Sequence, residues 1–349
     1  MNPPNSRQKH QPRLVLFLLP LVFLLSHCGR QTEVLHFNGQ TMGTFYSVKV
    51  ITDNPSAHKD LSSEIQKTLD RVDHLMSHWK ESSEVSRFNR LHPDAAITLS
   101  AETAVVVQAA LDIAQQTNGR FDPTLAPLIE LWGFGVKDRR GFPEPEAIQA
   151  AQARFGFQHL VLENGQLRKT LPDLTLNLSA IAKGYGVDAV AQMLREKNLA
   201  RFMVEVGGEI YAEGNNARNQ AWRLAVENPV LQDPNQPIAI SSLQGAALAT
   251  SGDYRNYFEH EGKTYTHIID PAKGYPVERH IASVSVIAPT CMQADGLATA
   301  FMVLSPEEAI AVCESMEGVA CLIAVYDESE GYRLFQSNNA SRWFEILNP

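Results

Sequence analysis

Two segments far apart in the chain place reactive polar groups in apolar, Ala-rich runs. Asp295 and Thr299 stand four residues apart in ADGLATAFMVL, so on a helix both oxygen atoms face the same side. Oxygen ligands on one helix face suit a hard cation such as Mg²⁺. A structural alternative is that Asp295 caps the helix while Thr299 bonds back to a carbonyl group one turn earlier.

The other segment is LSAIAKGYGVD, in which Lys183 stands among small residues beside Gly184. A lysine in this setting must reach solvent or meet an anion, and the free amides at the start of a helix favour phosphate. Close helix packing would explain the small residues but not the lysine. Together the two segments predict a metal-assisted site for a phosphorylated ligand.

A possible proton acceptor lies in KTYTHIIDPAKGYP, where His267 falls within a strand pattern before the turn at Asp270–Pro271. Its ordinary pKa of about 6.5 suits a general base, although a single strand histidine is more often structural. The segment VEVGGEI ends a strand pattern in two glycines, which permit either a close ligand approach or a sharp turn. GxGxxG and GxxxxGK[ST] are absent from the sequence, so neither a Rossmann site nor a P-loop is supported.

The elements that must position these groups follow from hydrophobic periodicity. Alternation predicts a strand over 44–52, and the spacing of Leu61, Ile65, Leu69, Val72, Met76 and Trp79 predicts a helix. Helices are also predicted over 100–119, 145–156, 179–199 and from Ser305, where a capping box begins. Strands are predicted over 202–206, 222–227, 265–269, 283–288 and 319–326, and a long ordered loop over 121–135.

This irregular interleaving of helices and strands predicts an α+β fold. The 349 residues would allow two domains, but the body of the chain shows no linker or repeat, which favours one large domain. The net charge of −9 leaves no basic stripe to neutralise phosphates along a strand, so nucleic acid is excluded as a partner.

The N-terminus is typical of an exported protein. Basic residues precede an apolar run over 14–25, which suits a secretory signal better than a membrane span. The run ends in LSHCG, which resembles a bacterial lipobox with Cys28 as the lipidated residue, although His27 replaces the usual small residue. An uncleaved anchor is the alternative, and both interpretations export the remaining chain.

Lipidation of Cys28 would leave Cys291, Cys313 and Cys321, an odd number for an oxidising compartment. Cys313 and Cys321 fall in apolar patterns, where cysteine usually acts as a small buried hydrophobe. The sequence contains neither a CxxC pair nor a Cys/His cluster, so zinc is not expected.

Eight motifs, in order along the chain, resemble those of the FAD:protein FMN transferases, the ApbE-type flavin transferases once called thiamine biosynthesis lipoproteins. They are TMGTFYSV, SEVSRFNR, FDPTLAPLIELWGFG, LSAIAKGYGVD, VEVGGEI, TSGDYRNYFE, YTHIIDP and ADGLATAFMVL. The resemblance implies a lipoprotein signal over 1–28, a short tether over 29–40 and one mixed flavin transferase domain over 41–349.

The resemblance also implies a ligand set. Mg²⁺ would be held by the carbonyl group of Ala180, the carboxylate of Asp295 and the hydroxyl of Thr299. FAD would be held by residues matching Met42, Trp79, Phe121, Asp122, Pro123, Asn177, Lys183 and the backbone near Ile269. Asn177 departs from the usual Asp, which keeps a carbonyl acceptor but removes a charge.

The implied reaction is the Mg²⁺-dependent transfer of the FMN moiety of FAD to a Thr or Ser hydroxyl, releasing AMP. The metal and Lys183 would neutralise the phosphates, and Asp295 would serve both metal binding and catalysis. His267 is the favoured acceptor of the hydroxyl proton, with Asp253 second.

Targets implied by the family are flavoprotein subunits of electron-transfer or ion-pumping complexes of the NADH:quinone reductase type, at the periplasmic face of the inner membrane. Two alternatives remain open. With water as the nucleophile the protein would be an FAD pyrophosphatase, and without catalysis it would be an FAD-binding lipoprotein.

Overall fold

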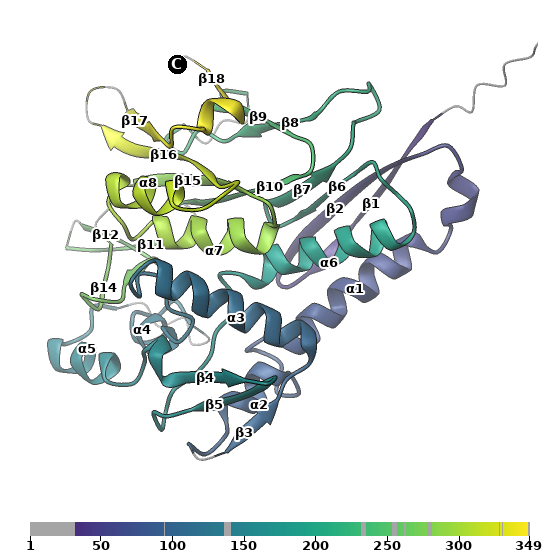
Figure 1. Ribbon diagram of the computed structural model, residues 1–349. Coiled ribbons are helices and arrows are strands. Elements are labelled where there is room, and N and C mark those ends of the chain that lie inside the picture. The colour runs from purple at the N-terminus through teal and green to yellow at the C-terminus, as the bar shows by residue number, and fades with distance from the viewer. Residues whose placement is uncertain are drawn as a thin grey trace, which may run out of the picture. The chain divides into compact units, whose positions relative to one another are not determined.

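An eight-stranded antiparallel sheet forms the centre of the computed structural model, which describes residues 32–93, 95–135, 141–231, 235–252, 257–261, 263–277, 281–327, 329 and 331–347. The strand order is β1-β2-β6-β7-β10-β15-β16-β17 (Figure 1). Their bounds are β1 Glu33–Thr41, β2 Thr44–Thr52, β6 Phe202–Val206, β7 Glu209–Glu213, β10 Ala246–Gly252, β15 Ile281–Ala288, β16 Ala320–Asp327 and β17 Gly331–Gln336. The signal segment, His27, Cys28 and Asp253 lie outside the described residues.

Both faces of this sheet are covered, which explains its composition. Alternate residues of β2, such as Val48 and Val50, pack into the helical core, whereas Ile51 packs on the other face. That other face carries the small sheet β18-β9-β8, with β8 Trp222–Val226, β9 Ala239–Leu243 and β18 Phe344–Ile346. All eight residues of β15 are buried because the strand is covered on both sides.

Helices form two layers beneath the sheet, with α6 and α7 next to it and α1 and α3 outside them (Figure 1). The bounds are α1 Leu61–Met76, α3 Ala101–Gln116, α6 Ala182–Glu196 and α7 Cys291–Phe301. Shorter helices are α2 Glu84–Asn89, α4 Ala126–Leu131, α5 Pro145–Gln152 and α8 Pro306–Glu314, whose predicted capping box is present. Within the described part of the chain, no helix has the length and apolar character needed to cross a membrane.

The remaining elements are short. Beyond α3 lies the sheet β3-β5-β4, with β3 Ala96–Thr98, β4 Leu160–Glu163 and β5 Gln166–Lys169. Two hairpins pair β11 Tyr257–His260 with β12 Lys263–Thr266, and β13 Ile269–Asp270 with β14 Tyr275–Pro276. The 3₁₀ turns are η1 Pro55–His58, η2 Phe157–His159 and η3 Ala340–Arg342. Residues 32–349 form one compact unit, as the predicted single α+β domain requires.

The N-terminal ends of α6 and α7 cross at very short range. A Cβ atom on Gly184 would collide with the backbone of Cys291 and the side chain of Asp295, so only glycine fits there. The carboxylate of Asp188 on α6 accepts the backbone amides of Cys291 and Met292, each at 2.8 Å, and caps α7. The two predicted polar segments are therefore brought into contact by packing and capping.

Two strands, β2 and β6, agree with the sequence prediction to the residue, but the N-terminal boundary differs. Glu33–Thr41, most of which we assigned to the tether, forms β1 and pairs with the whole of β2. Leu35 and Phe37 pack against the core while the alternate side chains are exposed. An edge strand with one buried face is half polar, so its sequence pattern also suits a tether.

Two further differences concern the site. The predicted loop over 121–135 contains α4, because Pro127 is compatible with a first helical turn and Leu128 is wholly buried. The predicted strand over 265–269 is interrupted, since β12 ends at Thr266 and β13 begins at Ile269. His267 therefore lies in a bend rather than inside a strand.

Candidate active site

A cavity of about 510 Å³ opens where the starts of α6 and α7 meet the β6–β7 turn and the end of β10. Most of the predicted site residues line it, although they come from five separate parts of the chain. They are Trp79, Phe121, Asp122, Pro123, Asn177, Ala180, Lys183, His267, Ile269, Asp295 and Thr299. Met42 is the exception, because it lies in the β1–β2 turn. Its Cε packs over Gly186 of α6, in the space that a Cβ atom on this glycine would take.

The most charged part of the cavity is a lysine between two buried carboxylates. Lys183 Nζ lies 2.7 Å from Glu209 Oε1 and 3.6 Å from Asp295 Oδ1. Glu209 and Asp295 are only 5% and 3% exposed, so their charges are poorly screened by water. With both carboxylates ionised, this cluster has one uncompensated negative charge.

Burial shifts the pKa of each group in this cluster. Burial, reinforced by the charge of Asp295, raises the pKa of Glu209 to about 7. The pKa of Asp295 is also raised, chiefly by burial, although Lys183 opposes the shift. Burial alone would lower the pKa of Lys183, but the two carboxylates outweigh it and raise that pKa, so the lysine is charged.

The carbonyl group of Ala180 is left without its helical donor. The Gly184 amide, which would bond to this carbonyl group in a regular helix, instead donates to Asp295 Oδ2 at 2.9 Å. Thr299 Oγ1 lies one turn along α7 from Asp295, 3.5 Å from Ser251 Oγ at the end of β10. A carbonyl, a carboxylate and a hydroxyl oxygen thus line one cavity.

These three groups are the oxygen ligands that a hard cation prefers. Among the residues that the structure describes, no cluster of three or more His, Cys, Asp or Glu side chains could hold a metal ion. Glu209 Oε2 is buried and has no hydrogen-bond partner within the described residues. The donor set and this unpaired oxygen therefore fit a hard cation rather than zinc.

The turn over 121–123 forms another wall, and its acidic side chain is already engaged. Asp122 Oδ1 accepts the amide and the hydroxyl of Thr124, and Asp122 Oδ2 accepts the Phe157 amide at 2.9 Å. Burial raises the pKa of Asp122, while these hydrogen bonds oppose the shift. The Asp122 carboxylate therefore stabilises this wall of the cavity through hydrogen bonds to Thr124 and Phe157.

Asn177 is engaged in the same way. Its backbone amide donates to the Pro123 carbonyl group at 2.7 Å, and its side-chain Oδ1 accepts the Ser179 backbone amide at 2.9 Å. The amide oxygen that was expected to face a ligand therefore also stabilises the turn before α6. Trp79 is 61% exposed at the cavity, and its ring lies 5.0 Å from that of His78.

The bend that carries His267 is fixed from two sides. The ring of Phe134 meets the imidazole edge-on at a centroid distance of 6.4 Å. Buried Asp270, three residues further on, forms an ion pair with Arg120 at 3.0 Å and accepts the Ala272 amide. The wall at 121–123 and the His267 bend are therefore tied together.

Sequence reasoning missed Glu209, because its motif VEVGGEI stands out for the two glycines rather than for the carboxylate. Gly207 and Gly208 have φ angles of 64° and 106°, which glycine adopts readily and which place Glu209 at the start of β7. The available signal was a carboxylate directly after two glycines, at the first position of a strand. Ser251 and Thr250 also line the cavity and gave no signal.

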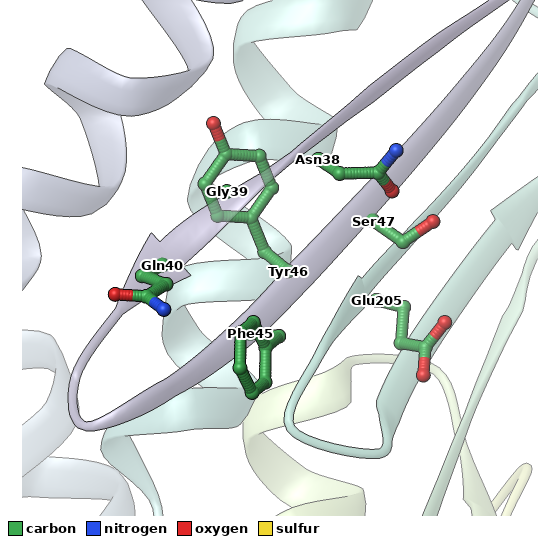
Figure 2. A pocket seen from close by; sticks show the side chains of 7 residues that line it. All are labelled: Asn38, Gly39, Gln40, Phe45, Tyr46, Ser47 and Glu205. Atoms are coloured by element: carbon green, nitrogen blue, oxygen red, sulfur yellow. The ribbon is translucent and has the colours of Figure 1, made fainter.

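A second hollow, of about 420 Å³, lies on the opposite face of the sheet over β1, β2 and β6 (Figure 2). Its lining contains Glu205 as the only ionisable group besides the Tyr46 phenol. Gly39 lies over the ring of Tyr46, where a Cβ atom would collide. This hollow is lined by no basic side chain and by a single carboxylate, so the larger cavity is the candidate active site.

Comparison with known proteins gives the class to which this fold and cavity belong. The sequence profile of the ApbE family matches residues 42–323. The FAD:protein FMN transferase of Vibrio cholerae is 40% identical over 326 residues, which cover 93% of this chain and 97% of that protein. The FAD:protein FMN transferase of Escherichia coli K12 is 36% identical and covers 88% of each chain.

Comparison with solved structures gives the same family. The flavin transferase ApbE from Vibrio cholerae superimposes with a TM-score of 0.81 at 38% identity, covering 89% of this chain and 99% of that one. The apo form of the Pseudomonas stutzeri flavinyl transferase ApbE gives a TM-score of 0.82 at 36% identity, covering 91% and 99%. The chain belongs to the ApbE family, and the predicted family and α+β fold are confirmed.

The raised pKa of Glu209 predicts pH-dependent stability when divalent cations are removed. The folded state binds this proton more tightly than the unfolded state, so stability is greatest at low pH and falls as the pH rises from about 4.5 through about 7. Glu209→Gln should reduce that fall by on the order of 2 kcal/mol. Urea unfolding between pH 5 and 8 measures it. Glu205→Gln, outside the cavity, is the control; an unchanged pH dependence in Glu209→Gln would contradict the assignment.

Proposed function

We propose that this protein catalyses the Mg²⁺-dependent transfer of FMN from FAD to a Thr or Ser hydroxyl of a target flavoprotein. The observation that carries the proposal is the contact between Lys183 and Asp295, at 3.6 Å, in a cavity that Ala180 and Thr299 also line. Its volume lies in the range of small-molecule sites. Curated relatives that share the fold and about 40% of the residues carry the name of this activity.

The residues that would hold Mg²⁺ are Ala180 through its carbonyl group, Asp295 through Oδ1 and Thr299 through Oγ1. Support comes from the carbonyl group left without a helical donor and from the uncompensated negative charge beside it. When bound, a divalent cation would neutralise charge on the FAD pyrophosphate.

Lys183 would bind the phosphate oxygens next to the metal site, at the start of α6 where helix amides also favour anions. Glu209 holds the ammonium group at 2.7 Å, which fixes the direction of Lys183 and keeps it charged. Trp79, the 121–123 turn, Asn177 and the backbone at Ile269 would form the walls for the rest of FAD. Met42 would act indirectly, through its contact with α6.

The transfer joins the hydroxyl oxygen of the target to the FMN phosphorus and breaks the phosphorus–oxygen bond to AMP. His267 would take the proton of the attacking hydroxyl, because its bend opens into the cavity and its ordinary pKa is near neutrality. Lys183 would stabilise the charge that develops on the leaving AMP.

We also propose that the protein is exported and anchored through a lipid on Cys28 at the periplasmic face of the inner membrane. The basic start, the apolar run over 14–25 and LSHCG support this location. The targets would be flavoprotein subunits of electron-transfer or ion-pumping complexes of the NADH:quinone reductase type. Together, these proposals describe a transferase that modifies proteins after their export.

Incubation of the full chain with FAD, Mg²⁺ and a candidate acceptor subunit tests the transfer. Mass spectrometry should find FMN covalently attached to one Thr or Ser of the acceptor, with AMP released in equal amount. Release of free FMN and AMP without protein-bound flavin would identify a pyrophosphatase instead. Absence of AMP release would identify a protein that only binds FAD.

The metal assignment predicts a graded effect at Thr299 and a severe one at Asp295. Thr299→Ser keeps the hydroxyl oxygen and should retain most activity, whereas Thr299→Val and Asp295→Ala should lower turnover at least about 100-fold. In a Mg²⁺ titration, Thr299→Val should need a higher Mg²⁺ concentration for half-maximal activity than Thr299→Ser. Equal activity of the Ser and Val variants would remove Thr299 from the metal site.

The role proposed for His267 predicts a split between chemistry and binding. His267→Ala should lower the transfer rate about 100-fold or more, because a general base contributes that much, while the FAD dissociation constant changes less than about tenfold. Single-turnover transfer and fluorescence titration of FAD measure the two effects. Parallel loss of both would make His267 a binding residue.

A further inference from the structure

Two of the buried cysteines face each other at the junction of α8 and β16. Cys313 lies in the last turn of α8 and Cys321 is the second residue of β16. Both residues are fully buried in the helical core. α8 packs against β16, and the side chains of Cys313 and Cys321 interact directly, so the two thiols are already neighbours in the folded chain.

The backbone around this thiol pair is held by one polar cluster. The Cys321 amide donates to Ser337 Oγ at 3.0 Å, and the Ser337 amide donates to the Cys321 carbonyl group at 3.1 Å. Ser337 Oγ donates to Asn339 Oδ1 at 2.8 Å, and Asn339 Nδ2 donates to the Val319 carbonyl group at 2.8 Å. The Asn338 amide also donates to Glu314 Oε1 on α8 at 3.0 Å, so the segment that leads into Cys321 is tied to α8 through residues 337–339.

The third described cysteine is in a different environment. Cys291 begins α7, and burial together with the charges of Asp188, Glu209 and Asp295 raises the pKa of its thiol well above the ordinary value. That keeps it protonated and unreactive. Cys313 and Cys321 instead interact with each other. The odd number of cysteines then resolves into one pair and one isolated buried thiol.

We propose that Cys313 and Cys321 form a disulfide bond when the chain folds in an oxidising compartment. The oxidant is a disulfide, either of a thiol oxidoreductase or of a small molecule such as oxidised glutathione. The Cys313 thiolate attacks one oxidant sulfur atom and expels the other as a thiol; Cys321 then displaces the second thiol. Two cysteine thiols are oxidised and one oxidant disulfide is reduced to two thiols.

Because both sulfur atoms are buried in the folded protein, the exchange takes place before α8 packs onto β16. The bond would close the short connection between these elements and stabilise their packing, since it restricts the unfolded chain. The step depends on the export proposed above for its occurrence in the cell. Refolding the isolated chain tests the pairing without that assumption.

The full chain is unfolded under reducing conditions, refolded with reduced and oxidised glutathione, and alkylated. Digestion after glutamate without reduction should then yield peptide 309–314 linked to peptide 318–328, since Glu314 and Glu317 separate the two cysteines. Reduction should release both peptides. The urea midpoint of the oxidised protein should exceed that of the reduced protein.

Cys291→Ala is the matched control and should retain the linked peptides, whereas Cys313→Ala should lose them together with the difference in urea midpoint. If Cys313→Ala does not fold, the peptide map of the wild-type chain still decides. Recovery of both peptides singly alkylated from refolded protein, or linkage of either to Cys291, would overturn the proposal. Linked peptides from a protein that fails to transfer FMN would overturn only the proposed function.

Discussion

The hydrogen bond from the Gly184 amide to Asp295 is the contact on which the site depends. It joins the first turn of α6 to the second turn of α7, and it forms only because residue 184 has no side chain to hold the helices apart. The same bond orients the Asp295 carboxylate and deprives the Ala180 carbonyl group of its helical donor. One close helix contact therefore prepares two of the three oxygen groups proposed for the cation.

The charges around that contact explain why a cation and an anion would bind in sequence. Lys183 is shared by two buried carboxylates, and poorly screened charges interact strongly. A divalent cation at this cluster would reverse its net charge from negative to positive. The pyrophosphate of FAD would then meet a positive site that the cluster alone does not provide, which favours metal binding first. Burial of Glu209 raises the cost of leaving the cluster uncompensated.

Local periodicity was sufficient to predict most elements from the sequence, because β2, β6 and the long helices each bury a regular face. It was insufficient where a second, distant element decides the structure. Glu33–Thr41 is half polar and becomes a strand only through its pairing with β2. The role of Glu209 depends on its ion pair with Lys183, which lies on another element. The oxygen pair on α7 was visible because both members lie on one helix.

The position of His267 shows how a break in a regular pattern can serve a site. A continuous strand over 265–269 would alternate its side chains between two faces and fix the imidazole by the sheet alone. The interruption between β12 and β13 instead leaves His267 in a bend whose far end is held by the Arg120–Asp270 ion pair. Because Arg120 directly precedes the 121–123 wall, the proposed base and a wall proposed for FAD share one support. A displacement of that support would move both together and preserve their relative geometry.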